Sequence, residues 1–221
     1  TGLVPICKST MTEFGLICSA ENINLGITRN PWNTDYTTGG SSSGSAALVA
    51  SGAVPIASAN DGGGSTRIPA ACCGLVGLKS SRGRLVHSDG SNLLPINIVC
   101  EGVVTRSVRD TAAYYAECEK YFKNKSLPDL GHVQSASSRR LKVLYFENNQ
   151  KGRLGHQDQD TFNTIKENMK LMESLGHQVD ILPFPIEIED CIDAFLGYYG
   201  FLGTAQVYFK KDINEDRIEP F

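Results

Sequence analysis

The hydrophobic pattern changes along the chain, and its first clear segments are short and built from small residues. Residues 44–52 (GSAALVASG) predict a short helix that can lie close to a sheet or another helix, because no bulky side chain intervenes. The apolar run at 53–58 then predicts a buried strand that is entered through Pro55. Glycine-rich sequence follows at once, so this strand leads into a loop.

From residue 107 to about residue 123, the apolar positions take the spacing of an amphipathic helix. Ser107 is suited to cap its start, because a serine hydroxyl can accept a hydrogen bond from an early backbone amide. The residues on one side are Val108, Ala112, Tyr115 and Cys118 or Glu119. We predict a surface helix here.

The last third of the chain predicts a strand, a helix and a second strand. The strands are residues 141–146 and 179–182, and the helix runs from about Asp158 to Leu175 with Gly176 as its cap. Its apolar side consists of Phe162, Ile165, Met169 and Met172, which we interpret as core rather than a cofactor site. A βαβ unit of this length indicates a layered α/β fold.

Residues 194–209 carry no charge but are fewer than the roughly 20 that a membrane span needs, and they include three glycines. We interpret them as a buried or site-covering helix. A composition of 41% hydrophobic and 20% charged residues favours a globular fold with a sizeable core. The net charge of −3, with both signs interspersed, indicates no surface for nucleic acid or anionic lipid. We expect a small or uncharged molecule as the partner.

Seven cysteines is an odd number, and they show neither zinc-ligand spacing nor the density of a disulfide-rich secreted protein. We interpret them as mostly buried thiols in a reducing compartment, which favours a cytoplasmic location. The adjacent Cys72 and Cys73 lie among small apolar residues, and a catalytic cysteine there is an alternative that no nearby histidine supports. No metal and no cofactor is expected.

Two loops rich in glycine and serine carry the candidate chemistry. They are residues 39–47 (GGSSSGSAA) and 61–70 (DGGGSTRIPA). The three glycines before Ser65 let several backbone N–H groups turn inward beside a hydroxyl, because side chains there would obstruct the curvature. Amide donors beside a hydroxyl form a geometry suited to acyl transfer.

Three other interpretations of the loops compete with acyl transfer. Residues 39–45 have the glycine spacing of a phosphate-binding loop, but Ser45 stands where its lysine belongs. Residues 40–44 fit Gly-x-Ser-x-Gly, which would make Ser42 the nucleophile of an α/β-hydrolase. That elbow should follow a strand, whereas residues 30–35 predict a turn. Flexible linkers would lack the helix and strand patterns that adjoin both loops.

Together with four more segments, these loops resemble the amidase signature family almost continuously through residue 110. The segments are residues 8–14 (KSTMTEF), 29–33 (RNPWN), 74–79 (GLVGLK) and 102–110 (GVVTRSVRD), in the family's order. The resemblance implies an α/β fold with a layered mixed β-sheet core covered by helices. It implies one partial domain, with the signature core at 1–110 and the βαβ region and covering helix at 111–221.

The resemblance also implies a role for each polar residue of the two loops. Ser65 is the implied nucleophile, and Ser41, held by a cis peptide, is the implied proton relay. The implied oxyanion hole consists of the amides of Gly62, Gly63, Gly64 and Ser65. Bracing of the loop is implied for Asp61, Arg67 and Ser42, and substrate contact for Thr10 and Met11.

The implied reaction is hydrolysis of a small linear or cyclic amide through a Lys, Ser, Ser relay without histidine. The family's lysine lies in a segment that would precede Thr1, and Lys8 is not that residue. We therefore expect residues 1–221 alone to be inactive and the parent protein, longer at both ends, to be an amidase. The sequences of residues 57–65 and 79–84 are most similar to the branch of 6-aminohexanoate cyclic-dimer hydrolases.

Two other functions stay open at this point. The same loops occur in the amidotransferase subunit that releases ammonia from glutamine for Gln-tRNA formation, although no tRNA-binding surface is indicated. A chain without the lysine could also act only as a folded, non-catalytic module. The expected partner is a small-molecule amide, with neither nucleic acid nor a membrane, and a homodimer stays open.

Overall fold

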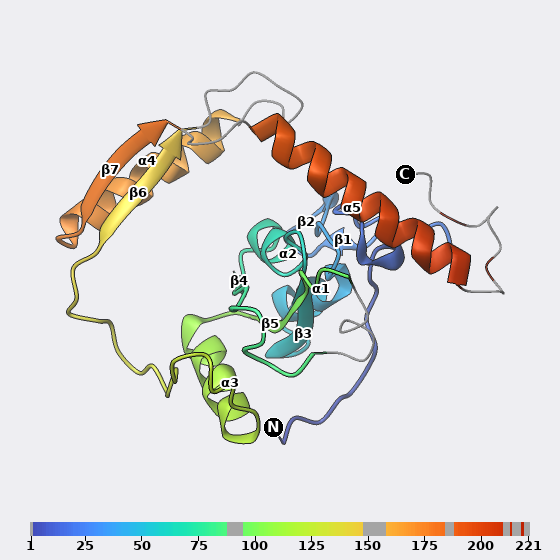
Figure 1. The fold of residues 1–221 in the computed structure, drawn as a ribbon, viewed down its shortest axis with the longest axis horizontal. Coiled ribbons are helices and arrows are strands. Elements are labelled where there is room, and N and C mark those ends of the chain that lie inside the picture. Colours follow the sequence, from blue (N-terminus) through green and yellow to red (C-terminus); the bar gives the residue numbers. More distant parts are fainter. Residues whose placement is uncertain are drawn as a thin grey trace. The chain divides into compact units, whose positions relative to one another are not determined.

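The computed structural model describes residues 2–87, 95–147, 158–183 and 188–209, together with Ile213 and Ile218. The chain divides into two compact units. Thr1–Ser135 and Gln206–Phe221 form the first unit, and Ala136–Ala205 form the second (Figure 1). A single domain over 1–221, with the signature core at 1–110, stays a prediction.

The first unit contains a three-stranded antiparallel sheet in the order β3, β5, β4. Its strands are β3 (Ile56–Asp61), β5 (Cys100–Thr105) and β4 (Val76–Gly77). The register pairs Ile56 with Thr105 at one end of β3 and Asp61 with Cys100 at the other. The strand predicted at 53–58 is thus confirmed with a shift of three residues toward the glycine loop, so that Asp61 ends the strand.

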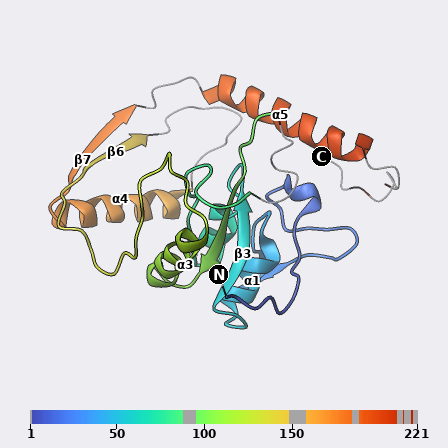
Figure 2. The same ribbon diagram turned by 60° about the horizontal axis from the view of Figure 1, so that its bottom comes forward.

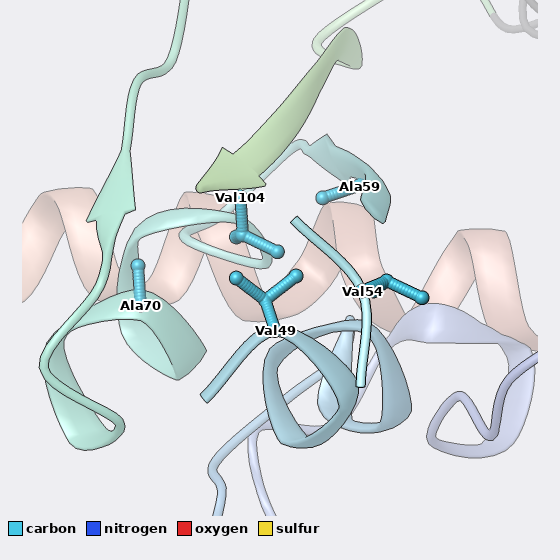
Figure 3. Packing of buried hydrophobic residues seen from close by; sticks show 5 residues of the cluster. All are labelled: Val49, Val54, Ala59, Ala70 and Val104. Carbon is cyan, nitrogen blue, oxygen red and sulfur yellow. The ribbon is translucent and has the colours of Figure 1, made fainter. Parts of the chain in front are cut away.

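Two short helices pack near this sheet, α1 (Ser43–Ala50) and α2 (Arg67–Cys72). In both ribbon views, α1 lies beside β3 (Figures 1 and 2). Val49 of α1 and Val104 of β5 are fully buried, and Figure 3 shows their side chains pointing toward each other. Val54, Ala59 and Ala70 complete this core cluster. The small residues predicted for α1 therefore allow the helix to approach the sheet closely.

The segment before the first loop forms a hairpin of β1 (Arg29–Asn30) and β2 (Asn33–Thr37). The prediction of a turn over residues 30–35 was therefore wrong for Asn33 onward, because backbone pairing with β1 extends these exposed polar residues. The hairpin is tied to the end of α2 by two side chains. Asn30 Nδ2 donates to the Cys72 carbonyl at 2.7 Å, and Trp32 Nε1 donates to the Cys73 carbonyl at 2.8 Å. These contacts give residues 29–33 a structural role.

The predicted surface helix is confirmed as α3 (Val108–Tyr121), which packs against β5. Ser107 Oγ accepts a hydrogen bond from the Asp110 amide at 3.1 Å, as expected of its N-cap. Just before this helix, Arg106 Nη1 donates to the carbonyls of Val49 at 2.9 Å and Val54 at 2.8 Å. Arg106 thereby holds the end of α1 close to the sheet.

The second unit contains the predicted βαβ unit and also most of the last helix of the chain. The βαβ unit consists of β6 (Lys142–Glu147), α4 (Gln159–Ser174) and β7 (Gln178–Pro183), with the two strands parallel. Asp158 Oδ1 accepts from the Thr161 amide at 2.8 Å, and Gly176 follows the helix at a φ of 85°. The layered α/β class predicted from the sequence is confirmed.

Helix α5 (Ile188–Phe209) begins six residues before the predicted start, since the apolar pattern of 194–209 is only part of it. Leu202 is buried, whereas Phe195, Phe201 and Tyr208 are exposed, so a buried helix was not the right expectation for these described side chains. A role in covering the site stays a prediction. Of the helices that the structure describes, none has the length and hydropathy required to cross a membrane.

The close approach of α1 to the backbone at Thr10 predicts the effect of one substitution. A Cβ added at Gly44 would lie 2.5 Å from the Thr10 amide nitrogen and 2.6 Å from Thr10 Oγ1. Gly44→Ala should therefore lower the free energy of unfolding by about 1–3 kcal/mol, although alanine normally favours a helix over glycine. Urea unfolding of the purified protein measures this loss.

Gly200→Ala is the matched control, because a Cβ at this helical position meets nothing within 4 Å. It should be neutral or stabilising by up to about 1 kcal/mol. Equal stabilisation by both substitutions would show that Gly44 is not needed for close packing.

Candidate active site

The second glycine loop is organised around the carboxylate of Asp61, the last residue of β3. Asp61 is 1% exposed, and its Oδ1 accepts from the Gly64 amide at 2.8 Å. Its Oδ2 accepts from the amides of Thr66 and Arg67, each at 3.3 Å. The Arg67 guanidinium completes the set, with Nε at 2.9 Å from Oδ2 and Nη2 at 2.9 Å from Oδ1. One buried carboxylate therefore closes the loop into a ring.

The same contacts keep Asp61 ionised. Burial by itself raises the pKa of Asp61, but the hydrogen bonds and positive charge of Arg67, with the amides of Arg67 and Thr66, outweigh it. The pKa of Asp61 is held below its ordinary value as a result. The negative charge of a carboxylate strengthens every hydrogen bond that it accepts from an N–H group. The loop is therefore most firmly held when Asp61 is ionised.

Ser65 lies between Gly64 and Thr66, two of the three residues whose amides donate to Asp61, and it is half-buried. A Cβ added at Gly64, which has a φ of 136°, would lie 2.7 Å from Ile68 Cδ1. Only glycine fits both the backbone conformation and the space at this position. The carbonyl of Ser65 accepts from the Ser42 amide at 3.2 Å, which joins the second loop directly to the first.

Ser41 lies one residue from this junction, after a cis Gly40–Ser41 peptide bond, as the resemblance implies. It is 1% exposed, and its Oγ has no hydrogen-bond partner among the residues that the structure describes. The Ser41 carbonyl accepts from the Thr12 amide at 3.2 Å. A Cβ at Gly40 would lie 2.5 Å from Thr12 Cγ2, so Thr12 packs tightly against this peptide. An unpaired buried hydroxyl is costly to maintain and therefore points to a function.

Ser42, the alternative nucleophile, has φ −81° and ψ 49° and stands at the N-cap position of α1. These angles lack the strained backbone of a nucleophile elbow, although the hairpin strand β2 does precede the loop. Ser42 is largely buried, and its amide is the donor to Ser65. The geometry thus gives Ser42 a bracing contact through its backbone.

The other sequence alternatives fit the geometry poorly. Ser45 Oγ donates to the Ser58 carbonyl at 2.7 Å, and the Gly44 amide donates to the Thr10 carbonyl at 2.9 Å, so neither is directed at a phosphate. Cys73 is fully buried, and burial raises the pKa of Cys73 to about 11. A thiol in that state is a weak nucleophile at neutral pH.

The two residues expected to contact substrate differ in their surroundings. Thr10 belongs to the scaffold, because its Oγ1 lies 2.8 Å from Thr28 Oγ1 and its carbonyl accepts from Gly44. Met11 is 48% exposed, and its Sδ would lie 3.7 Å from a Cβ added at Gly15. The sequence interpretation did not single out Gly15. Thr12, which anchors Ser41, was also missed, and only its place within residues 8–14 could have indicated it.

Other features of the first unit do not add to this site. A cavity of about 310 Å³ lies between residues 3–9, α1 and β3, but Ser41, Ser42 and Ser65 do not line it. Within the described ranges, no three His, Cys, Asp or Glu side chains are grouped so as to hold a metal ion. Among the residues that the structure describes, the candidate catalytic side chains lie in the two joined loops.

Comparison with known proteins connects these loops to amide chemistry. The family model described as Amidase matches residues 1–219. AmiC of Mycobacterium tuberculosis, which carries the name of an amidase, is 49% identical over 207 residues, covering 94% of this chain and 43% of the relative. A Glutamyl-tRNA(Gln) amidotransferase subunit from Shouchella clausii is 50% identical over 109 residues, covering 49% of this chain and 22% of the relative.

Two solved structures are similar over nearly the whole chain. A bacterial aryl acylamidase of the amidase signature enzymes has a TM-score of 0.76 at 26% identity, with 95% of this chain and 45% of the other covered. The 6-aminohexanoate cyclic dimer hydrolase complexed with substrate has a TM-score of 0.68 at 27% identity, with 96% and 47% covered. The chain spans less than half the length of these curated relatives and solved structures.

The Asp61 contacts predict a pH-dependent loss of stability. Asp61→Asn should lower the free energy of unfolding at pH 7 by about 1.5–3 kcal/mol, because it removes a buried, charge-assisted hydrogen-bond acceptor. A folded-state pKa below the unfolded value gives stability that is present above the unfolded pKa and lost as the pH falls through the folded pKa. The difference between variant and wild type should therefore shrink below about pH 4.

Urea unfolding of both proteins at pH 7 and about pH 3 measures this effect. Asp35→Asn is the control, since Asp35 is an exposed carboxylate on β2. A difference between wild type and Asp61→Asn that stays equal at both pH values would contradict the role given to the ionised carboxylate.

Proposed function

The chain belongs to the amidase signature family, and on that premise we propose that the protein hydrolyses a carboxylic amide through an acyl-enzyme on Ser65. The proposal is carried by the junction of the two loops, in which the Ser42 amide donates to the Ser65 carbonyl at 3.2 Å. This bond brings the backbones of Ser41 and Ser65 close together. Ser41 Oγ, buried and without a partner among the described residues, is suited to exchange protons there.

In the proposed reaction, Ser65 Oγ attacks the amide carbonyl carbon. Its proton passes to Ser41 Oγ, and the Ser41 proton passes to a neutral lysine amine. The C–N bond then breaks as the proton returns through Ser41 to the leaving nitrogen. Water attacks the acyl-enzyme by the same relay and releases the acid. The lysine is proposed to lie outside residues 1–221, so residues 1–221 alone should show no turnover.

The oxyanion of the tetrahedral intermediate needs N–H donors that are not already engaged. The Gly64 amide donates to Asp61 Oδ1 at 2.8 Å, which argues against its inclusion. The proposed donors are therefore the amides of Gly62, Gly63 and Ser65. Loss of one such donor typically lowers the rate by about 10²–10³-fold.

We propose a small linear or cyclic amide as the substrate class. The similarity to an aryl acylamidase and to a hydrolase of a cyclic dimer supports this range. A second candidate is glutamine hydrolysis for an amidotransferase, favoured by the relative from Shouchella clausii. Glutaminase assays of the full-length protein, with and without amidotransferase partner subunits, distinguish the two. A non-catalytic module would show neither activity.

Covalent labelling tests the nucleophile directly. A fluorophosphonate probe should label the full-length wild-type protein, and Ser65→Ala should abolish both labelling and amide hydrolysis, because the attacking hydroxyl is gone. Gel fluorescence and release of the amine product measure the two effects. Labelling that persists in Ser65→Ala would overturn the assignment of Ser65.

The two neighbouring serines of the first loop should respond differently. Ser41→Ala should lower kcat by about 10²–10⁴-fold, because the proton relay is lost in both acylation and deacylation. Ser42→Ala should cost much less, since its contact with Ser65 uses the backbone amide, which the substitution keeps. Pre-steady-state kinetics of the full-length variants separate the two steps. A larger loss for Ser42→Ala would favour the α/β-hydrolase interpretation instead.

A further inference from the structure

A turn of the chain at residues 12–17 lies against Ser41, and the sequence pattern did not predict it. The 3₁₀ helix η1 (Glu13–Gly15) begins just after Thr12, whose amide bonds to the Ser41 carbonyl at 3.2 Å. The Gly15 amide donates to the Thr12 carbonyl at 3.0 Å, and Thr12 Oγ1 donates to the Ile17 carbonyl at 2.8 Å. Residues 12–17 therefore form a closed turn that is fixed on Ser41.

Gly15 is the residue of this turn whose Cα hydrogen side faces the Ser41 hydroxyl. A Cβ added at Gly15 would lie 3.6 Å from Ser41 Oγ and 3.7 Å from Met11 Sδ. Both distances are ordinary van der Waals contacts, so a methyl group would fit and would occupy the space between the two side chains. Gly15 is half-buried and Met11 is 48% exposed, so this space lies toward the solvent side of the buried hydroxyl.

We propose that Gly15 and Met11 form the subsite for the substituent on the leaving nitrogen, and that Gly15 sets how large this substituent can be. The proposal rests on the role proposed above for Ser41. Because Ser41 returns the proton to the leaving nitrogen, that nitrogen must approach Ser41 Oγ. Whatever the nitrogen carries must then fit beside Gly15.

The chemistry of the two residues favours a flat, apolar substituent such as an aryl ring. A glycine offers only backbone on its open side, which a flat ring can approach closely. The Met11 thioether is polarisable and makes favourable contacts with aromatic rings. The protein should therefore accept N-aryl amides, and not only primary amides that release ammonia.

The test compares acetanilide with acetamide, which share an acyl group and differ only in the leaving nitrogen. Gly15→Ala in the full-length protein should lower the ratio of kcat/KM for acetanilide over acetamide by about tenfold or more. One added methyl group in a fitted pocket has an effect of this size. Damage to Ser41, Ser65 or the relay lowers both values but does not lower the ratio, because aniline is a weaker base than ammonia and depends less on protonation when it leaves.

Gly26→Ala is the matched control for backbone strain. Gly26 has a φ of 78°, close to the 70° of Gly15, but a Cβ there meets nothing within 4 Å. For Gly26→Ala, the ratio of kcat/KM for acetanilide over acetamide should stay within about twofold of the wild-type ratio. Met11→Ala provides a second variant, which should also lower the ratio, because the thioether contact with the ring is lost.

A binding measurement tests the subsite without any need for turnover. Calorimetry of acetanilide with the Ser65→Ala protein should give a Kd that rises at least about fivefold when Gly15→Ala is added. If the wild type hydrolyses neither amide, the proposed function is decided by the labelling of Ser65, and the binding measurement still decides the subsite. An unchanged Kd, or equal losses of kcat/KM for both amides, would overturn the subsite.

Discussion

The buried carboxylate of Asp61 is the constraint on which the rest of the site depends. It ends strand β3 and accepts from three loop amides and from the guanidinium of Arg67. Buried carboxylates are tolerated only when such partners satisfy them. The loop therefore has one closed arrangement, with Ser65 held between Gly64 and Thr66. The bracing role expected for Asp61 and Arg67 has a direct physical basis in these contacts.

A second set of contacts fixes the first loop against the second. The Ser42 amide bonds to Ser65, and the turn at residues 12–17 packs on the Gly40–Ser41 peptide through Thr12. Glycines at 40, 44 and 64 allow these close approaches, because a Cβ at each position would meet an atom at 2.7 Å or less. Preorganised donors and hydroxyls of this kind are what acyl transfer requires.

Much of this arrangement was predictable from the sequence, because its signals are local. The glycine runs mark both loops, and the apolar periods locate α1, α3 and the βαβ unit to within a few residues. The features that the sequence did not predict depend on backbone pairing and on hydrogen bonds made by side chains. The end of β3 at Asp61 is set by pairing with β5, about forty residues away, and the hairpin strand β2 is polar and exposed. Gly64 was expected to face an oxyanion, but its amide is engaged by Asp61, which only the three-dimensional arrangement reveals.

The most direct measurement is the location of the acyl group during turnover. Full-length protein would be mixed with an amide substrate and quenched in acid within milliseconds, and the adduct would be located by fragmentation mass spectrometry. The account predicts a mass increase equal to the acyl group on Ser65. An adduct on Ser41, Ser42 or Cys73, or turnover with no covalent adduct at any time point, would contradict it.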